Sequence, residues 1–292
     1  MPTLLRPAVW LLLFLSTLAA ADYPRLSDAR EARLQQAVNA ALQELGLQRA
    51  VRERRLAVTI VDLTDPHHPR MAGANGQHMF YSASLPKIAI LLGAFQRIED
   101  GELARDTALQ QDLEAMIRVS SNPAATRVLD LVGRDYLAEL LTSRRYGLYD
   151  PILGGGLWVG KAYGPEPAYR RDPLHQISHG ATTLQVARYY YLLETGRLVS
   201  PEASRQMKEI LSRPAIRHKF VKGLRRRFPE AEIYRKSGTW RDYHADSAIV
   251  QHDGKHYIVV ALSHDARGGE WLERLVLAVD RIMPATPPPP AP

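Results

Sequence analysis

The chain has 292 residues, a formal net charge of +7 and no cysteine. Hydrophobic residues make up 46% and charged residues 24% of the sequence, which is ordinary globular usage and excludes disorder over most of the chain. The length allows one large domain or two lobes that share a core. The lack of cysteine excludes disulfide bonds, thiol catalysis and cysteine-based metal sites.

The first 21 residues have the pattern of a cleaved signal peptide. Arg6 precedes an apolar run over residues 8–15, and Ala19-Ala20-Ala21 supplies the small residues that signal peptidase requires. The alternative is a membrane anchor, but the apolar run is too short to span a bilayer comfortably. We therefore expect a periplasmic or secreted protein with no stable membrane insertion after cleavage.

The positive charge is scattered along the chain, except for a cluster over residues 217–227. In an exported protein, this charge favours an anionic small substrate or a cell-wall polymer over nucleic acid. The alternative for the cluster is a solvated basic helix. We expect no nucleic-acid partner and a monomeric protein.

Hydrophobic periodicity predicts the elements of the N-terminal half. A helix capped by Ser27 is expected to run to about Leu47. A strand over 56–63 and a second strand ending at Tyr81 read as a hairpin, and the densely apolar stretch 85–98 predicts a buried helix. Further helices are expected over 112–119, 124–132, 136–141 and 183–194. The irregular segment 146–179 is long for a loop, which is typical of a functional one.

The C-terminal part returns to strands. Strands are expected over 232–237, 247–252 and 257–263, and Asp253-Gly254 is a hairpin turn signal between the last two. Helices are expected over 202–211, 216–226 and 271–282. Strands at both ends with helices between them predict an α+β fold, in which an antiparallel sheet of N- and C-terminal strands is flanked by helices and carries an inserted all-helical lobe. The expected parts are a signal peptide over 1–21, a catalytic domain over 22–283 and a proline-rich disordered tail over 284–292. Within the catalytic domain, an α/β lobe is expected roughly over 22–80 and 230–283, and a helical lobe roughly over 84–228.

Ser84 and Lys87 form the first of three short motifs. They stand in Ser84-Leu85-Pro86-Lys87, at the start of the most apolar predicted helix, so both side chains lie on one helix face. Burial disfavours the ammonium form of a lysine and lowers its pKa. We predict that the amine of Lys87 takes the proton from Ser84, which acts as the nucleophile. The alternative is a helix cap followed by a surface lysine.

The second motif is Ser120-Ser121-Asn122, which precedes Pro123 at a loop-to-helix junction. It could be a plain helix cap. In the functional interpretation, Ser120 relays a proton to the leaving group. Asn122 uses its amide to hold both Lys87 and a carbonyl of the substrate.

The third motif is Lys236-Ser237-Gly238-Thr239 at the end of a predicted strand. Lys236 supplies charge for a substrate carboxylate, to which the hydroxyl of Ser237 or Thr239 donates a hydrogen bond. Gly238 allows the backbone to approach a ligand closely. The N–H groups of Ser84 and Thr239 are expected to form an oxyanion hole.

Together the three motifs resemble those of the penicillin-recognising serine enzymes, and specifically of class A β-lactamases and their relatives. The resemblance extends to neighbouring segments and covers roughly residues 28–283. It implies the fold above and an acyl-enzyme formed with a β-lactam or a related amide, with no cofactor and no metal.

The resemblance also makes Glu166 a candidate for activating the water that hydrolyses the acyl-enzyme. In the family, a glutamate of a Glu-Pro pair in the active-site loop has this role, and Glu166-Pro167 offers such a pair. The asparagine that follows in the family is missing here, and the loop is shorter. Ser121 replaces an aspartate of the family's second motif, and Arg241 stands only by position for an arginine usually found after the third.

Three functions remain open. The leading hypothesis is β-lactamase-like hydrolysis of a β-lactam amide, with a small-molecule β-lactam or peptidoglycan-like substrate. The first alternative is a D,D-peptidase-like or esterase-like acyl hydrolase that acts on peptidoglycan or a related amide or ester. The second is a penicillin-binding sensor that does not hydrolyse its ligand.

His175 and His179 are four residues apart and could share a helix face. A metal site would need a third ligand, and none is evident. We expect a surface pair.

Overall fold

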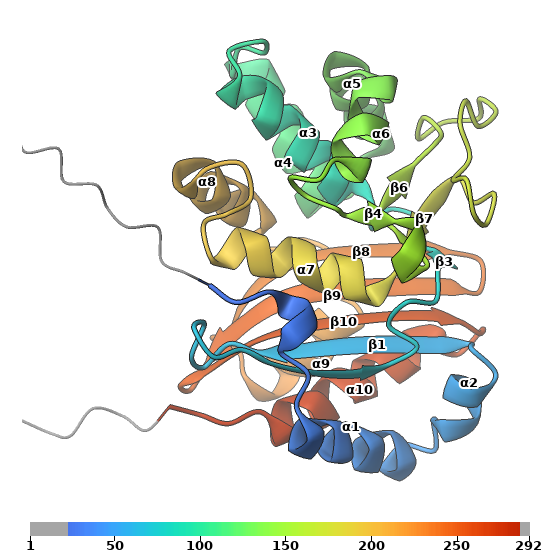
Figure 1. Cartoon of the computed structure of the whole chain (residues 1–292), viewed down its shortest axis with the longest axis vertical. Helices are drawn as coiled ribbons and strands as arrows, with labels where there is room; N and C mark the ends of the chain where they lie inside the picture. The colour runs from blue at the N-terminus through green and yellow to red at the C-terminus, as the bar shows by residue number, and fades with distance from the viewer. Residues whose placement is uncertain (1–22, 287–292) are drawn as a thin grey trace, which may run out of the picture.

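The computed structural model describes residues 23–286, so the predicted signal peptide and residues 287–292 lie outside the described part. Its centre is a five-stranded antiparallel sheet with the order β2-β1-β10-β9-β8 (Figure 1). The strands are β1 (Leu56–Asp62), β2 (Arg70–Ala74), β8 (Glu232–Trp240), β9 (Tyr243–His252) and β10 (Lys255–His264). N-terminal β1 therefore lies beside C-terminal β10, and the two ends of the domain close one sheet.

Helices cover both faces of the sheet. Every residue of β1 is buried, because each face packs against its own hydrophobic cluster. The helices on one face are α1 (Ala32–Glu44), α9 (Phe220–Arg227) and α10 (Gly268–Ile282), and α7 (Thr183–Glu194) lies across the other face (Figure 1). A short helix, α2 (Gln48–Arg52), leads from α1 into β1.

The inserted lobe is built around α3 (Lys87–Glu99), in which every residue from Lys87 to Gln96 is buried. An apolar helix of this kind must be surrounded on all sides. Its neighbours in the lobe are α4 (Thr107–Arg118), α5 (Asn122–Val132), α6 (Arg134–Thr142) and α8 (Pro201–Leu211). The predicted α+β fold class, with an antiparallel sheet flanked by helices, is confirmed.

Several short elements differ from the predictions. The strand near residue 80, β3 (Phe80–Tyr81), pairs with β7 (His179–Ala181) and not with β1, and β7 pairs with β6 (Trp158–Val159). Two further strands, β4 (Tyr149–Asp150) and β5 (Gly155–Gly156), pair across the 3₁₀ turn η2 (Pro151–Leu153). Strands of two or three residues are too short to show a hydrophobic period, so the predicted loop contains small sheets.

The first helix starts later than predicted. Ser27 lies in a 3₁₀ turn, η1 (Leu26–Asp28), and Glu31 caps α1 by accepting hydrogen bonds from the N–H groups of Arg33 and Leu34. The backbone on either side of Arg30 is bound to Met71, which holds it extended until Ala32. A tertiary contact therefore overrides the local capping signal of Ser27.

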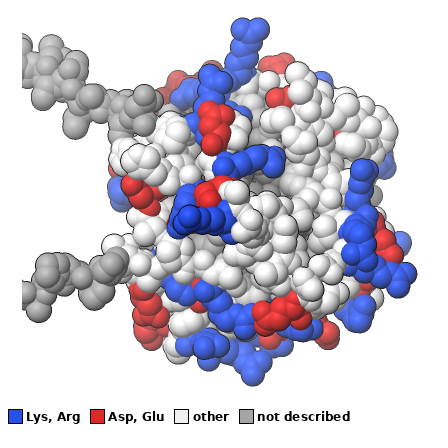
Figure 2. Space-filling view, turned by 60° about the horizontal axis from the view of Figure 1, so that its bottom comes forward, with Lys and Arg blue, Asp and Glu red and all other residues white. Residues whose placement is uncertain are grey.

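Charged side chains of both signs mix on the surface. On the face shown in Figure 2, Lys and Arg side chains gather in separate clusters with Asp and Glu among them. In the basic cluster of α9, both Lys222 and Arg226 pair with Glu273 of α10. Between residues 23 and 286, no helix has the length and apolarity needed to cross a membrane.

Candidate active site

The nucleophile candidate Ser84 stands in the turn that joins β3 to α3. Ala83 before it has φ of +52°, a conformation that non-glycine residues rarely adopt. This turn directs the chain into α3 and leaves Ser84 half-buried on the wall of a pocket of about 240 Å³. Strained residues of this kind are common beside functional side chains.

Lys87 is completely buried one turn further along. Its Nζ donates hydrogen bonds to the backbone oxygen of Ser120 at 2.6 Å and to Oδ1 of Asn122 at 2.8 Å. It also lies 4.6 Å from the ring centre of Tyr163. These partners favour the ammonium form, but burial outweighs them and lowers the pKa of Lys87 to about 7. A large fraction of the side chain is therefore the neutral amine near neutral pH.

Ser120 lies between two lysines. Its hydroxyl accepts a hydrogen bond from Nζ of Lys236 at 2.9 Å and lies 3.4 Å from Nζ of Lys87. Its φ of +59° turns the loop so that both contacts are made by one residue. Lys236 is fully buried, and burial, followed by repulsion from Lys87, places its pKa well below the usual range. The structure thus brings Lys87, Ser120, Asn122 and Lys236 into one hydrogen-bonded cluster.

Gly238 places the third motif against the first. A Cβ atom at this position would lie 2.1 Å from the backbone oxygen of Ser82 and 2.8 Å from the nitrogen of Ser84. Gly238 therefore allows β8 to approach the backbone around Ser84 closely, whereas the sequence predicted a close approach to a ligand. Thr239, the next residue of β8, lines the same pocket as Ser84. The N–H groups of Ser84 and Thr239, which are expected to form the oxyanion hole, thus belong to backbone segments that lie against each other. Ser237 lies between Lys236 and Gly238 on β8.

Lys219 is a site residue that sequence reasoning missed. It is buried behind β8, and its Nζ donates to the backbone oxygens of Gly238 at 2.7 Å and Ala245 at 3.1 Å and to the Thr239 hydroxyl at 2.8 Å. Burial lowers its pKa to about 8. Because Lys219 lies within a run of basic residues, the sequence favours a solvated position for it. Arg241, which stands by position for the arginine that the family usually has after the third motif, is exposed and lies over the ring of Trp240.

A buried ion pair between Arg235 and Asp246 holds Lys219 in place. Nε and Nη2 of Arg235 donate to the two carboxylate oxygens of Asp246 at 2.7 and 2.8 Å. The same carboxylate accepts from the backbone N–H of Phe220 at 3.1 Å, next to Lys219. Both side chains of the pair are at most 2% exposed, so neither charge has access to water as an alternative partner.

We expect Asp246→Asn to lower the free energy of unfolding by about 3 to 5 kcal/mol, because it leaves Arg235 buried without a counter-charge. Urea denaturation followed by circular dichroism measures this loss. The matched control is Glu202→Gln, which removes the exposed ion pair with Arg205 and should cost about 1 kcal/mol or less. An effect of Asp246→Asn no larger than that of the control would contradict this account of the ion pair.

Glu166 is not brought to the cluster. Its side chain is exposed in the loop, and the described residues that line the pocket beside Ser84 include no Asp or Glu. The wall nearest Lys87 is formed instead by Tyr163, whose ring stacks on that of His179 with the centres 4.3 Å apart and the planes at 5°. An aromatic pair thus stands close to the buried lysine.

His179 corrects the expectation of a surface histidine pair. His175 is exposed, but His179 is buried in β7, and it lines the pocket. Burial, with the positive charges of Lys161 and Lys87, lowers the pKa of His179 to about 3, so the ring is neutral. Its Nδ1 atom is buried without a hydrogen-bond partner among the described residues. The spacing of the two histidines could not reveal this, because β7 follows a short irregular segment and not a helix.

Within residues 23–286, no group of three or more His, Asp or Glu side chains could hold a metal ion. The chemistry that the described side chains themselves can supply is nucleophilic attack by a hydroxyl with a neutral amine as base. The cluster also supplies a hydroxyl, Ser120, that can pass a proton between lysines. The backbone donors next to Ser84 can stabilise negative charge on an attacked carbonyl.

Comparisons with solved structures find the same fold. A β-lactamase from Sphaerobacter thermophilus DSM 20745 is 20% identical with a TM-score of 0.65, over 83% of this chain and 95% of that one. A β-lactamase from Xanthomonas campestris pv. campestris str. ATCC 33913 is 17% identical with a TM-score of 0.66, over 85% and 98%. PBP-A is 17% identical with a TM-score of 0.64, over 85% and 97%. At this level of identity, the solved structures show a shared fold only.

No curated protein matches the sequence. A family model described as the β-lactamase enzyme family matches residues 34–112 and 105–279, which is most of the chain. This match includes all three motifs, and the fold agrees with it. The chain belongs to the β-lactamase enzyme family.

Proposed function

We propose that this protein is an exported serine hydrolase that forms an acyl-enzyme with β-lactam amides through Ser84. The observation that carries the proposal is the buried cluster beside Ser84, in which Lys87, Ser120 and Lys236 share hydrogen bonds. The lowered pKa of Lys87 supports its role as the base. The signal-peptide pattern of the first 21 residues supports action outside the cytoplasm.

In the acylation step, the neutral amine of Lys87 takes the proton of the Ser84 hydroxyl, and Oγ bonds to the carbonyl carbon of the lactam. The N–H groups of Ser84 and Thr239 stabilise the oxyanion that forms. When the C–N bond breaks, the leaving nitrogen takes the hydroxyl proton of Ser120. Ser120 regains a proton from the ammonium group of Lys87, so Lys87 is again the neutral amine and Ser120 again the hydroxyl when the acyl-enzyme is complete.

Binding of the substrate is assigned to the remaining motif residues. Asn122 lines the pocket and already contacts Lys87, so its amide nitrogen is available for a carbonyl of the substrate. Lys236, Ser237 and Thr239 are proposed to bind a substrate carboxylate. Lys219 is a positioning residue, because its hydrogen bond to the Thr239 hydroxyl fixes which way that hydroxyl points.

We further propose that hydrolysis of the acyl-enzyme is the slow step. Attack by water needs a base held next to the ester, and no carboxylate is among the described residues that line this pocket. Glu166 lies outside it, and the Tyr163 ring stands over Lys87. A water displaced by about 1 Å can react on the order of 10²-fold more slowly. One of the solved structures with this fold is a PBP-A mutant described as an acyl-enzyme complex with penicillin G.

The lack of a carboxylate among the described residues that line the pocket also favours a second candidate function. This candidate is a D,D-peptidase-like or esterase-like activity on peptidoglycan or a related ester or amide. Such an enzyme uses the same nucleophile, base and oxyanion donors. It does not depend on rapid hydrolysis of a β-lactam adduct. Release of D-alanine from a synthetic peptide ending in D-Ala-D-Ala would support this candidate over the β-lactamase function.

With a chromogenic cephalosporin, we expect a burst of about one equivalent followed by slow turnover, since acylation is complete before deacylation begins to limit the rate. Glu166→Gln should leave the slow rate unchanged within about twofold, as expected for a solvated side chain. Stopped-flow absorbance and the mass of the quenched protein measure both phases. The matched control is Glu230→Gln, another exposed glutamate. Fast hydrolysis without a burst would contradict slow deacylation, and a longer-lived adduct in Glu166→Gln alone would identify Glu166 as the deacylating residue.

A further inference from the structure

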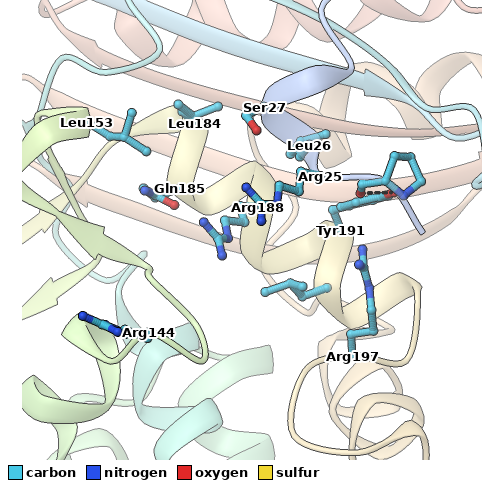
Figure 3. A pocket seen from close by; sticks show the side chains of 12 residues that line it. Arg25, Leu26, Ser27, Arg144, Leu153, Leu184, Gln185, Arg188, Tyr191 and Arg197 are labelled. Atoms are coloured by element: carbon cyan, nitrogen blue, oxygen red, sulfur yellow. Dashed lines mark hydrogen bonds between the residues drawn. The ribbon is translucent and has the colours of Figure 1, made fainter. Parts of the chain in front are cut away.

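A second cavity, of about 440 Å³, lies between η1, α7, η2 and the loop that carries Arg144 (Figure 3). None of the residues that line it belongs to the active-site pocket. The described residues around it include four arginines, Arg25, Arg144, Arg188 and Arg197, and no Asp or Glu. A concave site with several positive charges and no negative one favours an anionic ligand.

Three of these arginine side chains, Arg25, Arg144 and Arg188, have no hydrogen-bond or ion-pair partner among the described residues, and Arg188 of α7 is the one of the three that is not exposed. It is half-buried, and none of the hydrogen bonds or ion pairs among residues 23–286 involves its guanidinium. Burial lowers its pKa, and the charges of Arg197 and Arg25 act in the same direction. The carboxylate of Asp150, whose Oδ1 accepts a hydrogen bond from the N–H of Ile152, acts in the opposite direction and has a larger effect on this pKa than either arginine. A guanidinium in this position is stabilised when an anion binds it.

The backbone leaves room for this guanidinium. Gly147 has φ of +54°, and a Cβ atom on it would lie 3.4 Å from Nη1 of Arg188. Arg197 is by contrast already held, because it donates to the Thr195 hydroxyl at 2.9 Å and to the backbone oxygen of Tyr23 at 3.1 Å. Arg188 is therefore the partly buried arginine beside the cavity that is still free to bind.

Gln185 supplies a second, independent sign of a ligand. It stands one turn before Arg188 on α7 and is 1% exposed, yet neither Oε1 nor Nε2 has a hydrogen-bond partner among the described residues. Figure 3 shows its amide and the Arg25 and Arg188 side chains directed into the same space. A buried amide without partners is costly and uncommon. A bound group that accepts from Nε2 would remove part of that cost.

The rest of the cavity is apolar. Leu26 of η1, Leu153 of η2 and Leu184 and Leu192 of α7 line it next to the basic side chains. A ligand that fits both parts has a negatively charged head and a hydrocarbon body. Inorganic ions satisfy only the basic half of the cavity.

We propose that this cavity binds a small amphiphilic anion, with a carboxylate or phosphate head at Arg188 and Gln185 and an apolar body against the leucines. The site is separate from the active-site pocket and does not depend on the chemistry of Ser84. It gives the protein a second ligand, at the surface where η1 crosses α7.

Isothermal titration with octanoate, octyl phosphate and inorganic phosphate tests the proposal on the purified protein. We expect one or both octyl compounds to bind, and the tighter of the two identifies the preferred head group. Inorganic phosphate should bind at least about tenfold more weakly because it buries no apolar surface. Arg188→Gln should weaken octyl binding by about tenfold or more, the scale of one charge-assisted hydrogen bond.

Two further variants keep the test decisive. Arg25→Gln changes an exposed side chain of the same cavity and should also weaken binding, without a risk to folding. Arg213→Gln removes an exposed arginine far along the chain, outside the cavity, and should bind like the wild type. The proposal is overturned if no octyl compound binds, if inorganic phosphate binds equally well, or if Arg213→Gln weakens binding as much as Arg188→Gln. Normal labelling of Arg188→Gln by penicillin G would show that the active site is intact.

Discussion

Ser84→Ala is expected to abolish covalent labelling by penicillin G, because the variant has no oxygen with which to open the lactam at this position. Intact-mass spectrometry should show an adduct of one penicillin on the wild-type protein and none on the variant. Without the nucleophile, the neighbouring groups can contribute only binding and polarisation of the carbonyl, so the loss of activity should be the largest of any single substitution.

The control for Ser84→Ala is Ser82→Ala. Ser82 is two residues away and buried, and its hydroxyl makes only a long contact of 3.4 Å to the backbone oxygen of His179. This variant should be labelled at close to the wild-type rate. An adduct of the same mass on Ser84→Ala would show that another residue is the nucleophile.

Lys87→Ala is expected to slow acylation by about 10² to 10⁴, the contribution typical of a positioned base. The protein should still bind the substrate, because Asn122 and Thr239 remain in the pocket. Stopped-flow measurement of the burst phase separates the rate of acylation from binding. Circular dichroism establishes that the variant is folded, since removing a buried side chain can also cost stability.

Lys161→Ala is the matched control for Lys87→Ala, since Lys161 lines the same pocket and is only half-buried. Its rate of acylation should stay within about tenfold of the wild type, the scale of a lost surface charge near a site. A small primary amine added to Lys87→Ala should restore part of the rate if the missing group is a base. Acylation of Lys87→Ala at the wild-type rate would show that a different base acts on Ser84.

The sequence predicted the parts of the site that depend on local pattern. The apolar residues after Ser84 and Lys87 predicted a buried helix, which the structure has as α3, although Ser84 lies in the turn just before it. The three motifs also carried a resemblance strong enough to predict the fold class. The sequence predicted a close backbone approach at Gly238 but not its partner. The atoms that leave no room for a Cβ there belong to Ser82 and Ser84, which are far away in the sequence.

Other features could not be predicted because they arise from tertiary placement. Lys219 reads as one of several solvated basic residues, and only the contact of Phe220 with the buried Asp246 turns its segment inward. Tyr163 and His179 lie in segments without periodicity and come together through the short pairing of β6 with β7. Likewise, nothing local distinguishes Arg188 from the other arginines until the cavity around it is known.

The central claim is that a neutral Lys87 activates Ser84, and the rate of acylation by penicillin as a function of pH tests it most directly. The base must be unprotonated, and the pKa of Lys87 is about 7. The rate constant measured in the burst should therefore fall by about tenfold for each pH unit below that value and level off above it. A rate that is flat through this range, or that rises as the pH falls, would contradict the account.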